Sequence, residues 1–197
     1  MPPKTRFTSD RVLGSAFELV RVHGVDHMTA RTLAEHLGCS TAPIFRSYPS
    51  MDALFEALMD KIICYFMERL EQTHHDNPLV GAGIGWLRFA AEEPRLYEAV
   101  FLRMHPWSGK WWPIRELWVH RMGRVDDYMG LSESERNALV GRASIVMHGL
   151  GLEIWSGRIH RADFEALVLD LAMPVVESAL ISGRFDDPHG RSLCGES

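Results

Sequence analysis

The sequence lacks the features of a disulfide-bonded, zinc-binding or membrane-spanning protein. Its 197 residues include three cysteines, Cys39, Cys64 and Cys194, which do not have the spacing of a metal site or a disulfide framework. No run reaches the roughly 18 uninterrupted apolar residues of a membrane span, and the N-terminus has no apolar stretch of signal-peptide length. We therefore expect a cytoplasmic protein that binds no metal or cofactor and does not contact a membrane.

Strand signals are nearly absent as well, whereas apolar residues recur at helical spacing along the whole chain. The hydrophobic content of 46% is enough for a substantial core. We predict an all-α fold of about nine helices. A three-helix segment, residues 1–50, is expected to precede a larger helical body, residues 51–197.

A pair of short helices joined by a glycine turn is predicted between Thr29 and Leu54. Thr29 can cap the first helix, and Gly38 tolerates the positive φ at which the chain reverses. Ser40 is expected to cap the second helix, where Pro43 lies in the first turn and its missing N–H does little harm. This order is that of a helix-turn-helix, whose second helix enters the major groove of DNA.

The side chains of the second helix divide into two groups. Ile44 and Tyr48 are expected to face the first helix, and the outward positions are short, polar or basic, as a major-groove reader requires. The candidate DNA-binding residues are Thr29, Arg31, Ser40, Thr41, Ala42, Pro43, Phe45, Arg46, Ser47 and Tyr48.

The positive charge lies at the same end of the chain. Residues 1–50 carry six Lys or Arg against four acids, whereas the whole chain has a net charge of −5. Because docking depends on the potential of the docking face, a mildly basic segment on an acidic body is compatible with DNA binding.

Turn signals divide the rest of the chain into further helices. We expect helices over residues 9–23, 50–70, 81–91, 96–104, 114–129, 132–155 and 163–182. Ser132 and Glu135 form a capping box, and Pro174 is a candidate kink. Residues 104–113, rich in Pro, Gly and Trp, are predicted to be a loop.

The stretch Gly38–Leu54, GCSTAPIFRSYPSMDAL, resembles the signature of the TetR family of transcriptional regulators, Gly-Val-Ser-x-Gly-Thr-Leu-Tyr-x-His-Phe-x-Ser-Lys-Glu-x-Leu. Residues 89–101 and 147–152 are similar to the Pro-x-Leu-Tyr-x-x-x-Phe and Trp-His-Gly segments of one class of that family, with Met147 in place of the tryptophan. The resemblance implies a DNA-binding head and an all-α body that binds a ligand and dimerises.

Three departures from the signature weaken its contacts to DNA phosphates. Phe45 replaces a tyrosine, Ser47 a histidine, and Met51 a lysine at the start of the fourth helix. Each lost phosphate contact lowers the affinity for DNA and its salt dependence. Other basic residues are available to compensate: Lys4, Arg6, Arg31 and Arg46.

Large aromatic and Met side chains are abundant in the body. A cavity among such residues suits a hydrophobic or flat aromatic small-molecule effector, although ordinary core packing is the alternative for each. His105 and His148 are the candidate polar groups, and the tryptophans near 107–112 are expected to form a lid or a dimer contact. The candidate lining residues are Trp86, Phe89, Phe101, Met104, His105, Trp107, Trp111, Trp118, Met122, Met147 and His148.

By the same resemblance, helices 132–155 and 163–182 are expected to pack against their symmetry mates as a four-helix bundle in a homodimer. The candidate interface residues are Leu139, Ala143, Leu150, Ile154, Phe164, Leu167, Leu171 and Val175.

The leading hypothesis is therefore a homodimeric repressor that a small effector releases from a double-stranded DNA operator. An all-α small-molecule carrier whose head has lost DNA binding is the alternative. An enzyme ranks last. The glycines of GAGIG, residues 81–85, are expected to form a flexible entry to a helix because no strand precedes them, and the adjacent Glu92 and Glu93 cannot share a helix face as a catalytic pair.

Overall fold

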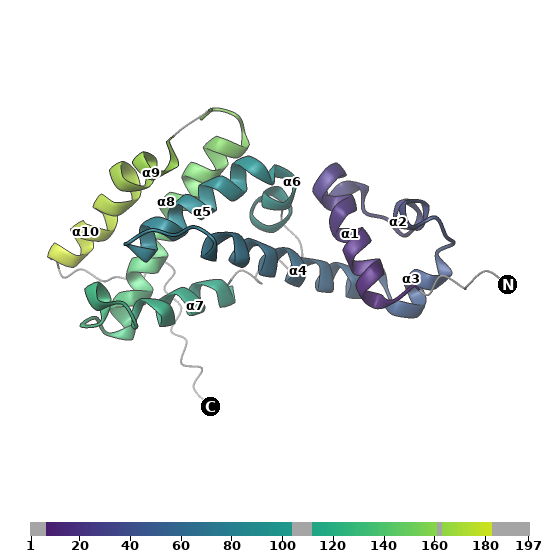
Figure 1. The fold of residues 1–197 in the computed structure, drawn as a ribbon, viewed down its shortest axis with the longest axis horizontal. Coiled ribbons are helices and arrows are strands. Elements are labelled where there is room, and N and C mark those ends of the chain that lie inside the picture. The colour runs from purple at the N-terminus through teal and green to yellow at the C-terminus, as the bar shows by residue number, and fades with distance from the viewer. Residues whose placement is uncertain (1–6, 104–111, 161–162, 183–197) are drawn as a thin grey trace. The chain divides into compact units, whose positions relative to one another are not determined.

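The computed structural model describes residues 7–103, 112–160 and 163–182, and these residues form helices and turns without any strand (Figure 1). The head of the chain contains α1 (Ser9–His23), the 3₁₀ turn η1 (Val25–His27), α2 (Ala30–Leu37), α3 (Ala42–Ser47) and α4 (Met51–Glu71). The middle contains α5 (Pro78–Glu92), α6 (Pro94–Tyr97), the π turn η2 (Glu98–Leu102), α7 (Trp112–Met122) and the 3₁₀ turn η4 (Asp126–Tyr128). The end contains α8 (Glu133–Trp155), α9 (Phe164–Leu167), the π turn η5 (Val168–Ala172) and α10 (Met173–Ser182).

Helices α9 and α10 are continuous through η5, so the described residues hold nine α-helices when these two are counted as one. The predicted all-α fold is confirmed. Pro174 lies just beyond the π turn, and its missing N–H leaves the helical carbonyl of Asp170 without its usual partner. Within the described residues no helix is both long and apolar enough to cross a bilayer.

The chain divides into two compact units. Residues 1–66 and 93–110 form the head unit, and residues 67–92 and 111–197 form the body unit. Helix α4 gives most of its length to the head unit and its last turn to the body unit. The boundary that we placed after residue 50 remains a prediction for the extent of the DNA-binding segment.

The core of the head unit forms where α1 packs against α2 and α3. Val12, Ala16 and Val20 recur along one face of α1 and are fully buried, and Leu33 of α2 and Ile44 of α3 are buried with them. The apolar stripe of α1 therefore fixes the positions of the two helices that follow it.

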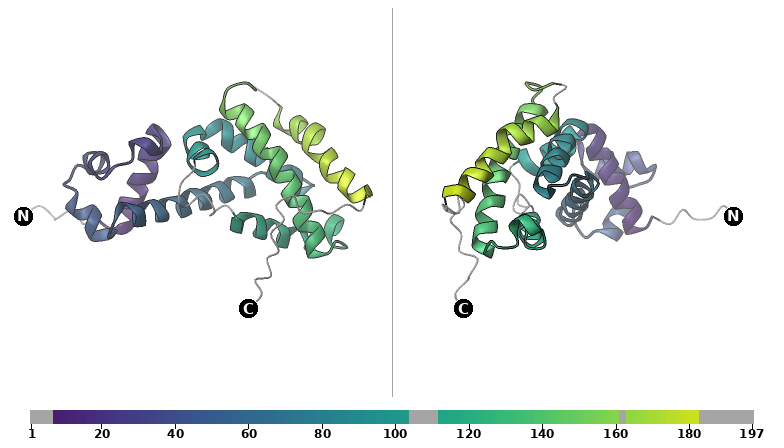
Figure 2. Two further views of the ribbon diagram at one scale, coloured as in Figure 1. Left: turned by 180° about the vertical axis from the view of Figure 1, so that it is seen from behind. Right: turned by 60° about the vertical axis from the view of Figure 1, so that its left-hand side comes forward.

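The body unit is built on α8, which packs against α5, α7 and α10. Both views of Figure 2 show α8 running alongside the α9–α10 helix. One core cluster joins α7, α8 and α10 through Met122, Leu139, Val140 and Val176. The predicted capping box begins α8: the Glu135 N–H donates to Ser132 Oγ at 3.3 Å, and the Ser132 N–H donates to Glu135 Oε2 at 2.6 Å.

Two predicted helix limits are wrong. The helix expected over 114–129 begins at Trp112 and ends at Met122, because Gly123 opens a turn that leads into η4. The expected loop at 104–113 therefore overlaps the start of α7, and its residues 104–111 lie outside the described part of the chain.

The glycine-rich GAGIG segment lies inside α5 and does not form a flexible entry to it. A Cβ atom at Gly85 would lie 2.9 Å from the Cα of Leu70, and one at Gly81 would lie 2.9 Å from the carbonyl oxygen of Thr73. A Cβ at Gly83 would lie 2.9 Å from both methyl groups of Val168. The glycines thus allow α5 to approach its neighbours more closely than any side chain would permit.

Candidate DNA-binding surface and ligand cavity

The turn between α2 and α3 is fixed by hydrogen bonds at its two ends. Thr29 and Thr32 cap α2 reciprocally: the Thr32 N–H donates to Thr29 Oγ1 at 3.1 Å, and the Thr29 N–H donates to Thr32 Oγ1 at 3.0 Å. Gly38 has the left-handed φ of 67° that ends the helix. The predicted cap at Thr29 and turn at Gly38 are confirmed.

The cap that we predicted for α3 is wrong by one residue. Thr41 is the N-cap and uses no side-chain hydrogen bond, so the Ser40 hydroxyl has no capping role. The backbone carbonyl of Thr41 instead accepts from the Ile44 N–H at 3.0 Å, and Pro43 lies in the first turn as predicted.

Helix α3 presents one face to solvent and the other to α1. Ile44 is 1% exposed, and the Tyr48 hydroxyl donates to the Ser9 carbonyl at 3.4 Å. Burial and the nearby Asp10 raise the pKa of Tyr48, so it stays a neutral donor at physiological pH. Tyr48 is therefore placed to hold the end of α3 against the start of α1.

The residues predicted to face outward do so to different degrees. Thr41, Ala42 and Arg46 are exposed, Ser47 is half-buried, and Phe45 is 45% exposed. Within the described residues Arg46 makes no ion pair, so its guanidinium is available to a phosphate or a base. The other candidate, Arg31 of α2, pairs with Glu35 at 3.0 Å in an exposed i, i+4 contact.

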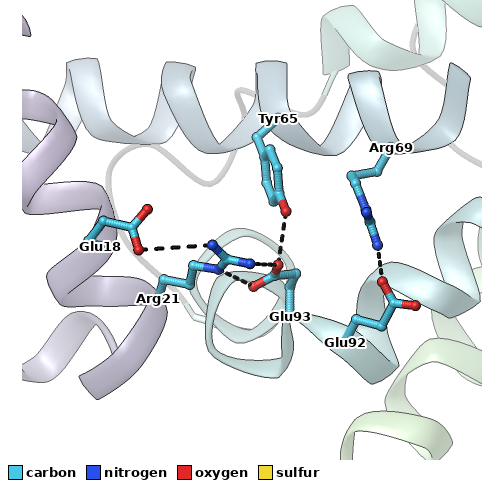
Figure 3. A network of polar contacts seen from close by, with 6 residues as sticks. All are labelled: Glu18, Arg21, Tyr65, Arg69, Glu92 and Glu93. Atoms are coloured by element: carbon cyan, nitrogen blue, oxygen red, sulfur yellow. Dashed lines mark hydrogen bonds and ion pairs between the residues drawn. The ribbon is translucent and has the colours of Figure 1, made fainter. Parts of the chain in front are cut away.

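A buried carboxylate holds α1 within the head unit (Figure 3). Glu93, whose side chain is 7% exposed, accepts from Arg21 Nε at 2.8 Å and from Arg21 Nη2 at 2.5 Å. The Tyr65 hydroxyl of α4 donates to the same carboxylate at 2.9 Å. The hydrogen bond that Arg21 donates to Glu93 is also the main cause of the raised pKa of Arg21. Glu93 thus joins α1, α4 and the start of α6, a role that its sequence context did not indicate.

Among the cavities that the described residues of the body unit form, two lie next to each other. The inner cavity, about 50 Å³, is almost entirely apolar and is lined by Leu70, Leu79, Ala82, Gly83, Trp86, Trp118, Val140, Ala143, Ser144 and Met147. The outer cavity, about 420 Å³, is polar on one side and is lined by Leu70, Glu71, Thr73, His74, His75, Asp76, Pro78, Ala82, Trp118 and Arg121.

Some of the predicted lining residues come together and others do not. Trp86, Trp118 and Met147 line the inner cavity. Phe89 and Met122 are core residues of the body unit, and Phe101 packs between Phe66 and Tyr97 in the head unit. The remaining candidates Met104, His105, Trp107 and Trp111 lie outside the described residues.

Sequence reasoning missed the small residues that create the inner space and the turn that lines the outer cavity. A cavity forms where side chains are small, whereas the prediction was based on the large aromatic and Met residues. The sequence pattern therefore did not indicate the small lining residues Ala82, Gly83 and Ser144. His74 and His75 lie between the helices predicted over 50–70 and 81–91, where no site was expected, yet both line the outer cavity.

His148, the other polar candidate, is half-buried on α8 and lines neither of these two cavities. Burial lowers the pKa of His148 below its ordinary value of 6.5. Between pH 6.5 and that lower pKa, the unfolded chain binds more protons at His148 than the folded chain does. The contribution of this group to the free energy of unfolding is therefore fully present above pH 6.5 and decreases as the pH falls through this window.

We expect the apparent Tm of the protein to fall between about pH 7.5 and about pH 5.5 and the variant His148→Gln to show a smaller fall. Thermal unfolding followed by circular dichroism measures both. His36→Gln, at an exposed histidine of α2, is the matched control and should keep the wild-type slope. An unchanged slope in His148→Gln would refute this assignment.

A buried α1 scaffold, a capped α2, a left-handed glycine turn and an exposed α3 together form a helix-turn-helix, which defines the class of DNA-binding transcription regulators. Residues 12–58 match the family model described as "Bacterial regulatory proteins, tetR family". This match to the N-terminal segment, the repressor relatives and the TetR-like structure described next support a TetR-family transcriptional regulator.

Similar proteins include two named repressors. The chain is 28% identical over 105 residues to the HTH-type transcriptional repressor DrrR1 of Streptomyces coeruleorubidus, covering 53% of this chain and 35% of the relative. It is 29% identical over 98 residues to the tetracycline repressor protein class D of Escherichia coli, covering 50% and 41%. The matches thus span less than half the length of these relatives.

The fold has a solved counterpart in a TetR-like transcriptional regulator from Rhodococcus sp. RHA1. Its TM-score is 0.60 at 15% identity, and the match covers 93% of this chain and all of that one. At this identity the likeness supports the fold of the whole described chain and does not identify a ligand.

Proposed function

We propose that this protein is a homodimeric transcriptional repressor that binds an operator through α3 and is released by a small hydrophobic or aromatic effector. The observation that best supports DNA binding is the solvent-exposed face at α3, while Ile44 is buried and holds the helix in place. The exposed residues on this face are Thr41, Ala42 and Arg46. Side chains of this size and polarity fit the major groove and its phosphates. The named repressors among its relatives favour repression over activation.

The direct test is a gel shift against the DNA upstream of the protein's own gene. We expect salt-sensitive binding of the wild-type chain, and we expect Arg46→Ala to lose about 1–3 kcal/mol per half-site because the one unpaired guanidinium on the described face of α3 is removed. The same titration over a range of salt concentrations measures the number of phosphate contacts.

A reciprocal variant strengthens this test. Met51 is half-buried at the first turn of α4, where the family signature has a lysine, so Met51→Lys is expected to tighten binding and to steepen the salt slope by about 0.9 per subunit. Lack of salt-sensitive binding by the wild type and by Met51→Lys at any promoter would favour the carrier hypothesis instead.

Effector control is supported by the inner cavity of the body unit. Its walls are apolar and include Trp86, Trp118 and Met147, which suits a flat hydrophobic ligand. In a dimer, the two α3 helices must have the spacing of successive major grooves to bind an operator. A ligand that binds more tightly to a conformation with a different spacing shifts the population away from the DNA-binding conformation.

Dimerisation is supported by apolar side chains that remain exposed on α8 and on the α9–α10 helix. Of the predicted interface residues, Leu171 is exposed, Phe164, Leu167 and Val175 are half-buried, and Leu139, Leu150 and Ile154 are buried inside the body unit, while Ala143 lines the inner cavity. We therefore add the exposed residues that the periodicity did not select: Ile145, Leu169, Leu180 and Ile181.

Replacing two of these residues tests the dimer. Leu169→Glu combined with Leu171→Glu places charge at two exposed apolar positions of the α9–α10 helix, and we expect sedimentation velocity to show a monomer with strongly reduced operator affinity. Met129→Glu, at an exposed apolar residue after η4, is the control and should stay dimeric. A dimer that survives both charges would place the interface elsewhere.

A further inference from the structure

The two cavities of the body unit share a wall. Leu70, Ala82 and Trp118 line both of them, so a ligand that occupies the inner cavity has its other end beside the outer one. The inner cavity offers one hydroxyl, that of Ser144, which already donates to the Val140 carbonyl at 2.7 Å. The inner end therefore favours an apolar body, and the chemistry of the ligand's other end is set by the outer cavity.

The outer cavity has an excess of negative charge. Glu71 and Asp76 line it against a single fixed cation, Arg121, and Glu165 lies 3.7 Å from His75 Nε2. The Nδ1 of His75 accepts from the Asn77 N–H at 2.9 Å, so this ring is held in the turn beside Glu165. A carboxylate or phosphate on a ligand would meet this excess of acid, whereas a cation would be attracted by it.

Arg121 marks the position that a cation takes in this cavity. Its guanidinium pairs with Glu71 at 2.5 Å and lies over the Trp118 ring, with Cζ 5.5 Å from the ring centroid. A cation carried by a ligand would find the same indole face and carboxylate on displacing the partly exposed Arg121 guanidinium. Trp118 also lines the inner cavity, so this one residue can contact both the apolar body and the charged end of a ligand.

We propose that the effector is a hydrophobic cation, with a planar apolar body in the inner cavity and an ammonium or similar group beside Trp118 and Glu71. This inference rests on the proposed effector control, and it specifies the chemical class of the ligand. Because the inner space is about 50 Å³, the apolar body of the ligand enters by displacing wall side chains such as Trp86, while Trp118 stays as the face that contacts the cation.

Three probes with the same ring and different charge test the proposal: (2-naphthylmethyl)trimethylammonium, 2-naphthalenemethanol and 2-naphthylacetate. Binding to the full-length protein is measured by calorimetry at about pH 8, where unshifted histidines are neutral. We expect the ammonium probe to bind about tenfold more tightly than the carboxylate, since two modest contacts favour the cation and the acids repel the anion. Equal or tighter binding of the carboxylate, or no binding of any probe, would overturn the proposal.

Two variants locate the selectivity. Glu71→Gln removes the carboxylate and leaves Arg121 without this partner, so the preference for the ammonium probe should shrink or reverse. Ala143→Phe fills the inner cavity and should weaken all three probes, whereas Ala143→Ser should not. Trp118→Leu, which should weaken the ammonium probe more than the alcohol, provides a second test if Ala143→Phe unfolds. A cation preference that survives both Glu71→Gln and Trp118→Leu contradicts the site.

DNA release is measured separately, by adding the ammonium probe to the protein–operator complex. Release at concentrations that saturate the cavity supports both the ligand class and effector control. Selective binding without release keeps the ligand class and refutes effector control, while operator binding that fails in the absence of any probe refutes the DNA-binding function alone.

Discussion

Gly85→Ala is expected to destabilise the protein, although alanine is the better helix former. The new Cβ would lie 2.9 Å from the Leu70 Cα and 3.1 Å from Thr73 Oγ1, and the backbone of α4 cannot rotate away from it. Overpacking of this kind costs about 1–3 kcal/mol, against a gain in helix propensity of about 1 kcal/mol. We expect urea unfolding to show a net loss of about 1 kcal/mol.

Gly149→Ala is the matched control, because the same substitution in α8 meets open space. No atom outside its own helix lies within 4 Å of the Cβ position at Gly149, and the residue is exposed. This variant should gain about 0.5–1 kcal/mol from helix propensity alone. Opposite signs for the two substitutions support the close approach of α5 to the end of α4. Stabilisation by both would contradict it.

The same glycines show where a single sequence stops being informative. Local composition gives a glycine-rich segment, and from composition alone flexibility is the natural interpretation. The reason for Gly85 lies in Leu70 and Thr73, which are distant in sequence and adjacent in space. By contrast, the caps at Thr29 and Ser132 and the turn at Gly38 depend only on neighbours within a few residues, so they could be predicted.

The candidate sites divide in a similar way. Helical periodicity identifies which residues share a face, but it does not distinguish a face that packs inside one chain from a face that packs against a second copy. Leu139 and Leu150 were therefore assigned to a dimer surface, and both are buried inside the body unit. The exposed face of α3 could be predicted because the helix is short and Ile44 is its one strongly apolar anchor.

Arg21→Met is expected to destabilise the head unit strongly. It keeps the apolar stem and removes the charge that pairs with Glu93, whose side chain is 7% exposed and would keep only the Tyr65 hydroxyl among the partners shown in Figure 3. Breaking a buried pair by removing one partner costs about 3–5 kcal/mol. We expect about 3 kcal/mol, the lower end of that range, because Arg21 is itself 41% exposed and water replaces part of the contact.

A double-mutant cycle isolates the cause of this loss. The double variant, Arg21→Met with Glu93→Gln, has no buried charge, and the amide oxygen introduced at position 93 can still accept from the Tyr65 hydroxyl. We therefore expect urea unfolding to show that the double variant regains most of the stability that Arg21→Met loses. Arg31→Met, which removes the exposed pair with Glu35, is the control and should change stability by less than about 0.5 kcal/mol. A loss in Arg21→Met no larger than in this control would mean that Glu93 is not the anchor of α1.

The position of Glu93 in the chain gives this cluster a functional consequence. Helix α5, whose Ala82 and Trp86 line the inner cavity, ends at Glu92, and the next residue is the one that holds Arg21. Under the proposed effector control, a movement of the end of α5 would be passed to Glu93 through the peptide bond that joins it to Glu92. Arg21→Met should accordingly weaken operator binding and reduce its response to the ammonium probe, while calorimetry shows unchanged binding of that probe to the cavity. An intact response in the variant would mean that the signal reaches α1 by another route.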